Sequence, residues 1–240
     1  ASTIPNCVSY DPTYAYELAV IFHDGLKRMY ENKENVFYYI TLMNENYTHG
    51  AMPKGAEEGI LKGMYLLREG NDPGSKTRVQ LLGSGTILRE VEAAAEMLWS
   101  IFNVSADIWS VTSFNELRKE GMEAERWNLL HPDSEPRVPY VTKVLRGRKS
   151  PVVAATDHIR AYADQIRPYI RNHFTTLGTD GFGRSDSREK LRHFFEVDRY
   201  FITVAALNAL ADKGLIGRSK VADAIKRFGI NPDKPFPVKV

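Results

Sequence analysis

RVQLLGSGTILREVEAAAEML, residues 78–98, passes from an apolar run through a glycine-containing turn into a helical pattern. Residues 78–82 have the length and apolar character of a buried strand. The apolar residues that follow recur every three or four positions, which predicts an amphipathic helix. They are Ile87, Leu88, Val91, Ala94, Ala95, Leu98 and Phe102. A strand, a short turn and a helix form the repeating unit of an α/β sheet.

The same rhythm continues toward the C-terminus. We predict strands at 106–111, 152–155 and 174–177, each followed by a helical pattern. Ser113 is expected to cap a short helix, and two helices at about 196–213 and 218–228 close the chain, the second ended by Gly229. Strands that alternate with helices predict a mostly parallel sheet that is covered by helices on both faces.

The first 74 residues follow a different pattern. Asp11 and Pro12 predict the start of a helix that covers about 12–30, and residues 36–42 predict a buried strand. Residues 44–74 look irregular because glycine and proline recur throughout them. We therefore expect a domain boundary within this stretch.

Composition restricts the class of protein. Hydrophobic residues make up 43% and charged residues 26%, as in globular domains, and no apolar run reaches the ~18 residues that a membrane span needs. With 32 basic and 30 acidic residues, the net charge of +2 favours neither a nucleic acid nor a membrane as partner. The basic run 143–149 (KVLRGRK) lacks interleaved aromatic residues, so we interpret it as a solvated loop.

Cys7 is the only cysteine, which excludes an internal disulfide and favours a reducing, cytoplasmic location. The opening residues ASTIPN have neither the basic nor the apolar region of a signal peptide. They resemble the interior of a protein, so we expect the sequence to be part of a longer one.

No motif predicts a catalytic, cofactor-binding or metal-binding residue. The turn Gly83-Ser84-Gly85 lacks the third glycine of a dinucleotide fingerprint, because Leu88 occupies that position, and a plain tight turn is favoured. The six histidines form no zinc motif. His193 and Glu196 could share a helix face, but two groups do not make a metal site, and His131 is expected in an exposed loop.

The motif LGTDGFGRSDSRE, residues 177–189, predicts a tight turn into a helix. Asp186 would be the N-cap, with Glu189 completing a capping box, and Gly181 and Gly183 would supply positive φ angles. Arg184 and Arg188 then remain exposed, and either could form a salt bridge across an interface or bind a carboxylate.

Several long blocks carry a family resemblance, among them YDPTYAYELAVIFHDGL (10–26), AMPKGAEEGILKGMY (51–65) and the two motifs above. Together they resemble the C-terminal part of the homodimeric-type pyruvate dehydrogenases of the transketolase superfamily. The resemblance implies that residues 1–52 end a pyrimidine-binding domain, 53–74 form a linker, and 75–240 form a transketolase-like C-terminal domain.

The resemblance also implies a function. Such enzymes are oxidoreductases that decarboxylate pyruvate on thiamin diphosphate with Mg²⁺. They pass the acetyl group to lipoyl groups of an acetyltransferase component, between glycolysis and acetyl-CoA. The family's cofactor and catalytic motifs precede the matched region, so we expect this segment to bind neither cofactor nor metal. It would be inactive alone and would support the fold and a homodimer.

Two alternatives stay open on the sequence alone. The chain could be an independent α/β module that binds a small anion or nucleotide, either at the turn 83–86 or at the loop around Arg184. It could also be an autonomous enzyme whose site has no recognisable motif.

Overall fold

The computed structural model describes residues 1–240 and contains a five-stranded sheet in the order β3-β5-β4-β6-β7. The last four strands are parallel to one another, and β3 runs antiparallel to β5 at one edge. This arrangement confirms the predicted α/β fold with a mostly parallel sheet. The strands are β3 (Tyr65–Arg68), β4 (Arg78–Gly83), β5 (Ser105–Ser110), β6 (Val152–Ala155) and β7 (Phe174–Leu177).

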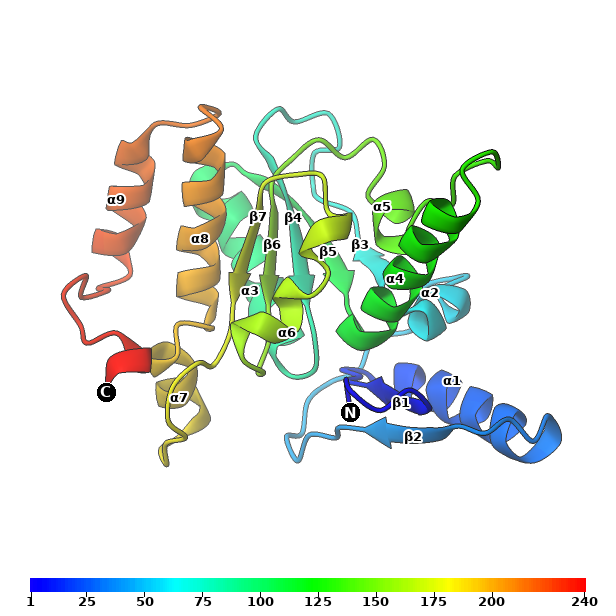
Figure 1. The fold of residues 1–240 in the computed structure, drawn as a ribbon. Coiled ribbons are helices and arrows are strands. Elements are labelled where there is room, and N and C mark those ends of the chain that lie inside the picture. The colour runs from blue at the N-terminus through cyan, green and yellow to red at the C-terminus, as the bar shows by residue number, and fades with distance from the viewer.

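Helices cover both faces of this sheet (Figure 1). Alternate strand residues point to opposite faces, so Leu81 packs with α3 and α8 while its neighbour Leu82 packs with α4, α5 and α6. The first face is covered by α3 (Ile87–Phe102) and α8 (Arg199–Asp212), with α9 (Arg218–Arg227) against α8. The second is covered by α4 (Phe114–Leu130), α5 (Tyr140–Val144) and α6 (Arg160–Asp164).

Gly83 allows α3 to pack closely on the end of β4. A Cβ atom at this position would lie 2.8 Å from the Cα of Leu88 and 3.0 Å from a methyl group of Val91. Two residues later, Gly85 adopts a φ of +51°, which favours glycine. The turn within 78–98 therefore needs both glycines for geometric reasons.

The N-terminal residues form a separate two-stranded parallel sheet of β1 (Cys7–Tyr10) and β2 (Phe37–Ile40). Between the two strands the chain forms α1 (Ala15–Leu26), which continues into a π-helical turn at Lys27–Glu31. Figure 1 shows this unit at the end of the large sheet where the parallel strands terminate. The sequence did not predict β1, because four residues are too few to show a period.

Strand β2 is less buried than predicted. Its side chains alternate between exposed and half-buried, with Phe37 44% and Tyr39 57% exposed. The reason is that only one face of β2 is covered: Tyr38 and Ile40 pack against the cluster that contains Tyr10, whereas Phe37 and Tyr39 point to the opposite, exposed face.

The stretch 44–74 is not irregular throughout, which corrects the prediction. It contains α2 (Glu57–Lys62) and β3, and the side chain of Ile60 within α2 is fully buried. Both elements are short and flanked by glycines, so their composition resembles that of a loop.

Two predicted helix starts were wrong. Helix α1 begins at Ala15 rather than Pro12, and its first turn is capped by Glu17. Helix α7 (Arg188–Phe194) is capped by Ser187, whose hydroxyl accepts the N–H of Lys190 at 3.4 Å. Asp186, the predicted cap, instead accepts the N–H of Ser187 at 2.7 Å.

The glycines before α7 also differ from the prediction, because Gly181 has a φ of +113° whereas Gly183 has no positive φ. Ser113 caps α4 as predicted, accepting the N–H of Glu116 at 3.0 Å, but that helix is 17 residues long rather than short. Gly229, with a φ of +64°, follows α9 as predicted.

The chain also contains two 3₁₀ turns. One lies between α6 and β7, at Arg167–Tyr169, and the other lies near the C-terminus, at Pro237–Lys239. The first carries Pro168, which cannot continue an α-helix and follows shortly after the end of α6 at Asp164. None of the helices has both the length and the apolar character needed to cross a membrane.

Candidate functional site

The carboxyl ends of β4 and β6 form the point where the strand order of the sheet reverses. Open α/β sheets commonly bind ligands in the crevice at such a point. Here the crevice holds the chain's own N-terminal segment, since the N–H of Gly85 donates to the carbonyl of Asp11 at 3.1 Å. Thr13 Oγ1 donates to the Gly85 carbonyl at 2.6 Å, and Ser84 Oγ donates to Thr156 Oγ1 at 2.9 Å. The glycine turn is thus a structural contact between the two parts of the chain.

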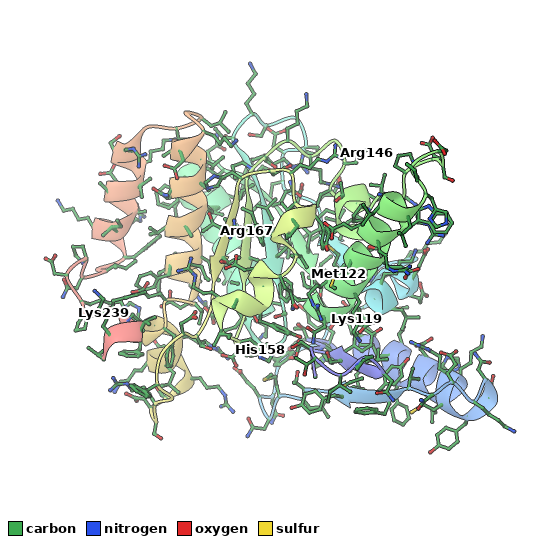
Figure 2. The ribbon with its side chains drawn as sticks, viewed as in Figure 1. Lys119, Met122, Arg146, His158, Arg167 and Lys239 are labelled. Atoms are coloured by element: carbon green, nitrogen blue, oxygen red, sulfur yellow. The ribbon has the colours of Figure 1, made fainter.

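Asp11 continues this contact with its carboxyl group. It lies 3.1 Å from His158 Nε2 and accepts the hydroxyls of Tyr162 and Thr41, each at 2.7 Å. Figure 2 shows His158 at the end of the sheet that faces the N-terminal unit. The sequence missed this cluster, because Asp11 looked like a helix cap and His158 belongs to no motif.

The cluster changes the pKa values of its members. Burial alone would raise the pKa of Asp11, but hydrogen bonds from His158, Thr41 and Tyr162 hold it below its ordinary value. The hydrogen bond to Asp11 raises the pKa of His158 above its ordinary value, although burial opposes the change. The arrangement therefore favours a charged pair between the two parts of the chain.

Glu17 forms a second polar contact deep in the same junction. Its carboxyl group is fully buried and accepts the backbone N–H groups of Thr13 at 2.5 Å and Tyr14 at 3.0 Å. It also accepts the hydroxyls of Tyr65 and Ser110, both at 2.6 Å. One side chain on α1 thereby binds β3 and β5 of the large sheet. Burial, followed by the nearby Glu17, raises the pKa of Tyr65 far above its ordinary value.

A network of arginines and glutamates connects the segment after β2 to three helices. Arg192 lies 2.8 Å from Glu45 and 3.4 Å from Glu90, and Arg199 lies 2.9 Å from Glu90. Burial would raise the pKa of Glu90, but the hydrogen bond from Arg199 keeps it below its ordinary value. These pairs join α3, α7 and α8 to Glu45.

A cavity of about 400 Å³ lies beside this network and is lined by residues from both parts of the chain. Arg188, at its edge, donates to Asn44 Oδ1 at 2.6 Å and lies 3.8 Å from Glu45, so it forms a salt bridge across the junction. Arg184 has no carboxylate partner, and its guanidinium lies 4.9 Å from the ring centre of Phe194. The structure thus gives the two arginines different surroundings.

The side chains present do not fit a thiamin diphosphate and Mg²⁺ site. No three His, Cys, Asp or Glu side chains gather closely enough to hold a metal ion. The buried carboxyl groups are already occupied by partners within the chain, as described for Asp11, Glu17 and Glu90. A cofactor diphosphate with its cation needs a converging set of free oxygen ligands, which this arrangement does not offer.

The remaining residues singled out in the sequence have structural roles. His131 is exposed and stacks on Trp127, with ring centres 3.6 Å apart. His193 does not share a helix face with Glu196, because Glu196 follows the end of α7 with a φ of +63°. His193 Nδ1 instead lies 2.8 Å from Asp198 Oδ2.

The basic run 143–149 is not simply a solvated loop. Arg148 lies 2.6 Å from the buried Asp107 and 3.0 Å from Glu69. Its partners come from distant parts of the chain, so the local sequence could not reveal them.

Two family models match the chain in succession. The middle domain of the pyruvate dehydrogenase E1 component matches residues 1–50. The transketolase-like C-terminal domain matches residues 63–198, which is more than half of the chain.

Curated relatives match along the whole chain. A pyruvate dehydrogenase E1 component of Cupriavidus necator is 58% identical over 239 residues, covering 100% of this chain and 27% of its own length. The E1 component of Escherichia coli K12 is 57% identical over 237 residues, with coverage of 98% and 26%. The chain thus spans about a quarter of the length of these relatives.

Solved structures show the same fold at low sequence identity. Transketolase from Leishmania mexicana superimposes with a TM-score of 0.58 at 16% identity, covering 99% of this chain and 28% of that one. A split-gene transketolase, described as an inactive beta4 tetramer, gives a TM-score of 0.54 at 15% identity, with coverage of 88% and 60%. With the resemblance of the sequence confirmed, the chain belongs to the family of the transketolase-like C-terminal domain, in the form found in pyruvate dehydrogenase E1 components.

Proposed function

We propose that the chain is part of a cytoplasmic pyruvate dehydrogenase that decarboxylates pyruvate on thiamin diphosphate and transfers the acetyl group to lipoyl groups. The observation that carries this proposal is the identity of 57–59% to E1 components along essentially the entire chain. Conservation of that extent over both matched regions supports a shared activity of the whole protein rather than a shared fold alone.

Within that enzyme, we propose that the segment positions one domain against another. Residues 1–52 would end the pyrimidine-binding domain and 75–240 would form the C-terminal domain. The linker 53–74 would include β3, which pairs with β5 and so anchors it to the large sheet. The buried contacts of Asp11 and Glu17 support this role, because they fix the two parts in one relative position. A shared active site needs such rigid support.

The cofactor would be held by residues outside this segment. When bound there, thiamin diphosphate would supply an electron-accepting thiazolium for the decarboxylation. The side chains of this segment do not fit thiamin diphosphate or Mg²⁺. This observation favours a structural rather than a catalytic role for these residues.

The N-terminal unit has surface that a further part of the protein would cover. Side chains on α1, the π-helical turn and β2 are apolar and exposed, including Phe22 at 58% and Tyr30 at 74%. Apolar side chains gathered next to an unpaired strand edge favour burial against more protein. We propose that the rest of the pyrimidine-binding domain covers this surface. We further propose that the full-length protein forms a homodimer that works with a lipoyl acetyltransferase component.

The test compares the full-length protein with a chain limited to residues 1–240. Calorimetric titration with thiamin diphosphate and Mg²⁺ should show binding only to the full-length protein. Likewise, only the full-length protein should decarboxylate pyruvate. Tight cofactor binding by residues 1–240 alone would contradict the supporting role, and an inactive full-length protein that still binds cofactor would contradict the activity.

One observation favours the alternative of an independent anion-binding module. Thr86, from the glycine turn, and Arg184 line the same cavity, although 98 positions separate them in the sequence. Glu45 and Asp157 line this cavity as well, and their negative charges oppose the binding of an anion. Titration of residues 1–240 with a nucleoside triphosphate distinguishes the enzyme segment from the independent module. Only an independent module should bind the nucleotide at micromolar concentration.

A further inference from the structure

A second hollow lies at the opposite end of the sheet, where β4 and β6 begin. The two strands pair directly, and the N–H of Gln80 donates to the carbonyl of Pro151 at 2.8 Å, so the loops that precede them are neighbours. Figure 1 shows these loops at the end of the sheet away from the N-terminal unit, and Figure 2 places Arg146 at that end, opposite His158. The hollow between the loops has a volume of about 460 Å³.

The side chains around this hollow are positively charged or neutral. Its 10 lining residues include four cations, Lys76, Arg78, Arg148 and Lys149, and no carboxylate. This composition differs from that of the cavity at the junction, where Glu45 and Asp157 offset two of the three arginine charges. Two of these cations, Lys76 and Lys149, come from separate loops and form no salt bridge, so they create a local positive potential that attracts an anion.

Two of the four cations, Arg78 and Arg148, are held in place by a buried carboxylate. Arg78 Nε lies 2.9 Å from Asp107 Oδ2, and Arg148 Nη1 lies 2.6 Å from the same oxygen. Asp107 is fully buried and positions both guanidinium groups, and Arg148 also lies 3.0 Å from Glu69, so two carboxylates together balance the two positive charges. The two guanidinium groups are therefore rigid, and the excess positive charge of the hollow comes from Lys76 and Lys149.

The other donors around the hollow are free. Lys76 and Lys149 are exposed, and neither forms a salt bridge. Ser150 Oγ accepts a hydrogen bond from Gln80 at 2.9 Å, which leaves its own proton to donate elsewhere. The backbone N–H groups of Gly147 and Lys149 make no hydrogen bond within the chain. Ammonium, hydroxyl and amide donors around fixed guanidinium groups form the type of surroundings that phosphate oxygens bind.

We propose that this hollow binds a small organic phosphate or pyrophosphate that carries at least two negative charges. The basic run 143–149, which the proposed enzyme activity does not use, provides one wall of the site. The 73–78 loop provides the other wall. Recognition needs only charge and phosphate geometry, so the organic part of the ligand would remain largely outside the hollow.

The test measures binding of pyrophosphate to the full-length protein by calorimetry at low ionic strength, without added metal. We expect one saturable site whose affinity falls by about tenfold or more in the double variant Lys76→Ala/Lys149→Ala. The matched control, Lys54→Ala/Lys239→Ala, removes two exposed lysines that also lack salt bridges but lie away from the hollow. Its affinity should remain within about twofold of the unmodified protein.

Three results would overturn the proposal. The first is the absence of saturable binding at millimolar pyrophosphate. The second is an equal loss of affinity in both double variants, which would mean that only net charge matters. The third is binding of poly-L-glutamate, but not pyrophosphate, that depends on Lys76 and Lys149, which would make this surface a contact for an acidic protein. The lysines are exposed and unpaired, so their replacement should leave the unfolding midpoint in urea unchanged.

Discussion

His158 Nε2 lies 3.1 Å from Asp11 Oδ1, although 147 positions separate the two residues in the sequence. The pair joins the N-terminal unit to the loop after β6, within the crevice where the strand order reverses. The position of the N-terminal unit therefore depends in part on a titratable contact.

Stability should fall as the pH rises through the raised pKa of His158. The folded-state pKa of His158 exceeds the ordinary value of about 6.5. The pair therefore contributes its full share of the folding stability below about pH 6.5, and this share is lost as the pH rises from there through the raised pKa. The depressed pKa of Asp11 keeps its own contribution present above about pH 4. The His158 side chain is 41% exposed, so solvent screening limits the effect to about 1 kcal/mol, or about 2–4 °C in Tm.

The measurement compares thermal unfolding of the unmodified chain and of His158→Gln between pH 6 and 8.5. The variant should lose this part of the pH dependence, whereas His131→Gln, at an exposed histidine without a carboxylate partner, should retain it. Equal pH slopes in all three proteins would show that the pair contributes no linkage.

Replacing Glu17 by Gln should destabilise the protein by about 2–4 kcal/mol. Both carboxyl oxygens accept hydrogen bonds, so the NH₂ group of Gln would face either two backbone N–H groups, which cannot accept, or the hydroxyls of Tyr65 and Ser110, which would have to reverse their hydrogen bonds. Urea unfolding measures the change. The exposed Glu57, in the first turn of α2, provides the control Glu57→Gln, which should shift stability by less than about 0.5 kcal/mol. A similar midpoint for both variants would contradict the buried hydrogen-bond cluster.

The two glycines of the 177–189 motif should respond differently to alanine. At Gly181 the φ of +113° is unfavourable for alanine, and the new Cβ would lie 2.4 Å from the Pro237 carbonyl oxygen, so we expect a loss of about 1–3 kcal/mol. Gly183→Ala places its methyl group in open space without a positive φ, and we expect a change below about 0.5 kcal/mol. Denaturant unfolding of the two variants, side by side, tests the difference, and equal losses would contradict the backbone geometry of this turn.

Amide hydrogen exchange in residues 1–240 should be fastest in the π-helical turn Lys27–Glu31 and in β2. These segments contain no buried residue, and β2 has one free edge. Strand β1 is fully buried and binds α4 through Ser113, whose hydroxyl donates to the Ser9 carbonyl at 2.6 Å, so its protection should exceed that of β2. Mass spectrometry of exchanged peptides gives the comparison. Uniform protection from residue 27 to residue 110 would contradict it.

The parts of the fold that local pattern controls could be predicted from the sequence. The strand, turn and helix of 78–102 were predicted closely, because apolar spacing and two glycines lie within one continuous stretch. By contrast, Asp11 gave a good local signal for a helix cap, yet its actual partners are at positions 41, 158 and 162. No local pattern can encode such distant partners.

The candidate site could be predicted only in part, because its contacts also join residues that are distant in the sequence. Arg188 was expected to form a salt bridge across an interface or to bind a carboxylate, and the structure places it 3.8 Å from the Glu45 carboxylate of the same chain. The cluster around Glu17 was missed, because a glutamate near the start of a helix usually signals a solvated first turn. The expected lack of cofactor and metal binding by this segment stays a prediction for the titrations above.

Residues 11–13 occupy a position that sheets of this type often leave open to a diffusing molecule. Because this guest is covalently tethered, its local concentration is in the millimolar range or higher, and a free competitor would seldom displace it. Substitutions on the two sides of the crevice should therefore depend on each other. A substitution near Gly85 is tolerated only if residues 11–13 can still bind there.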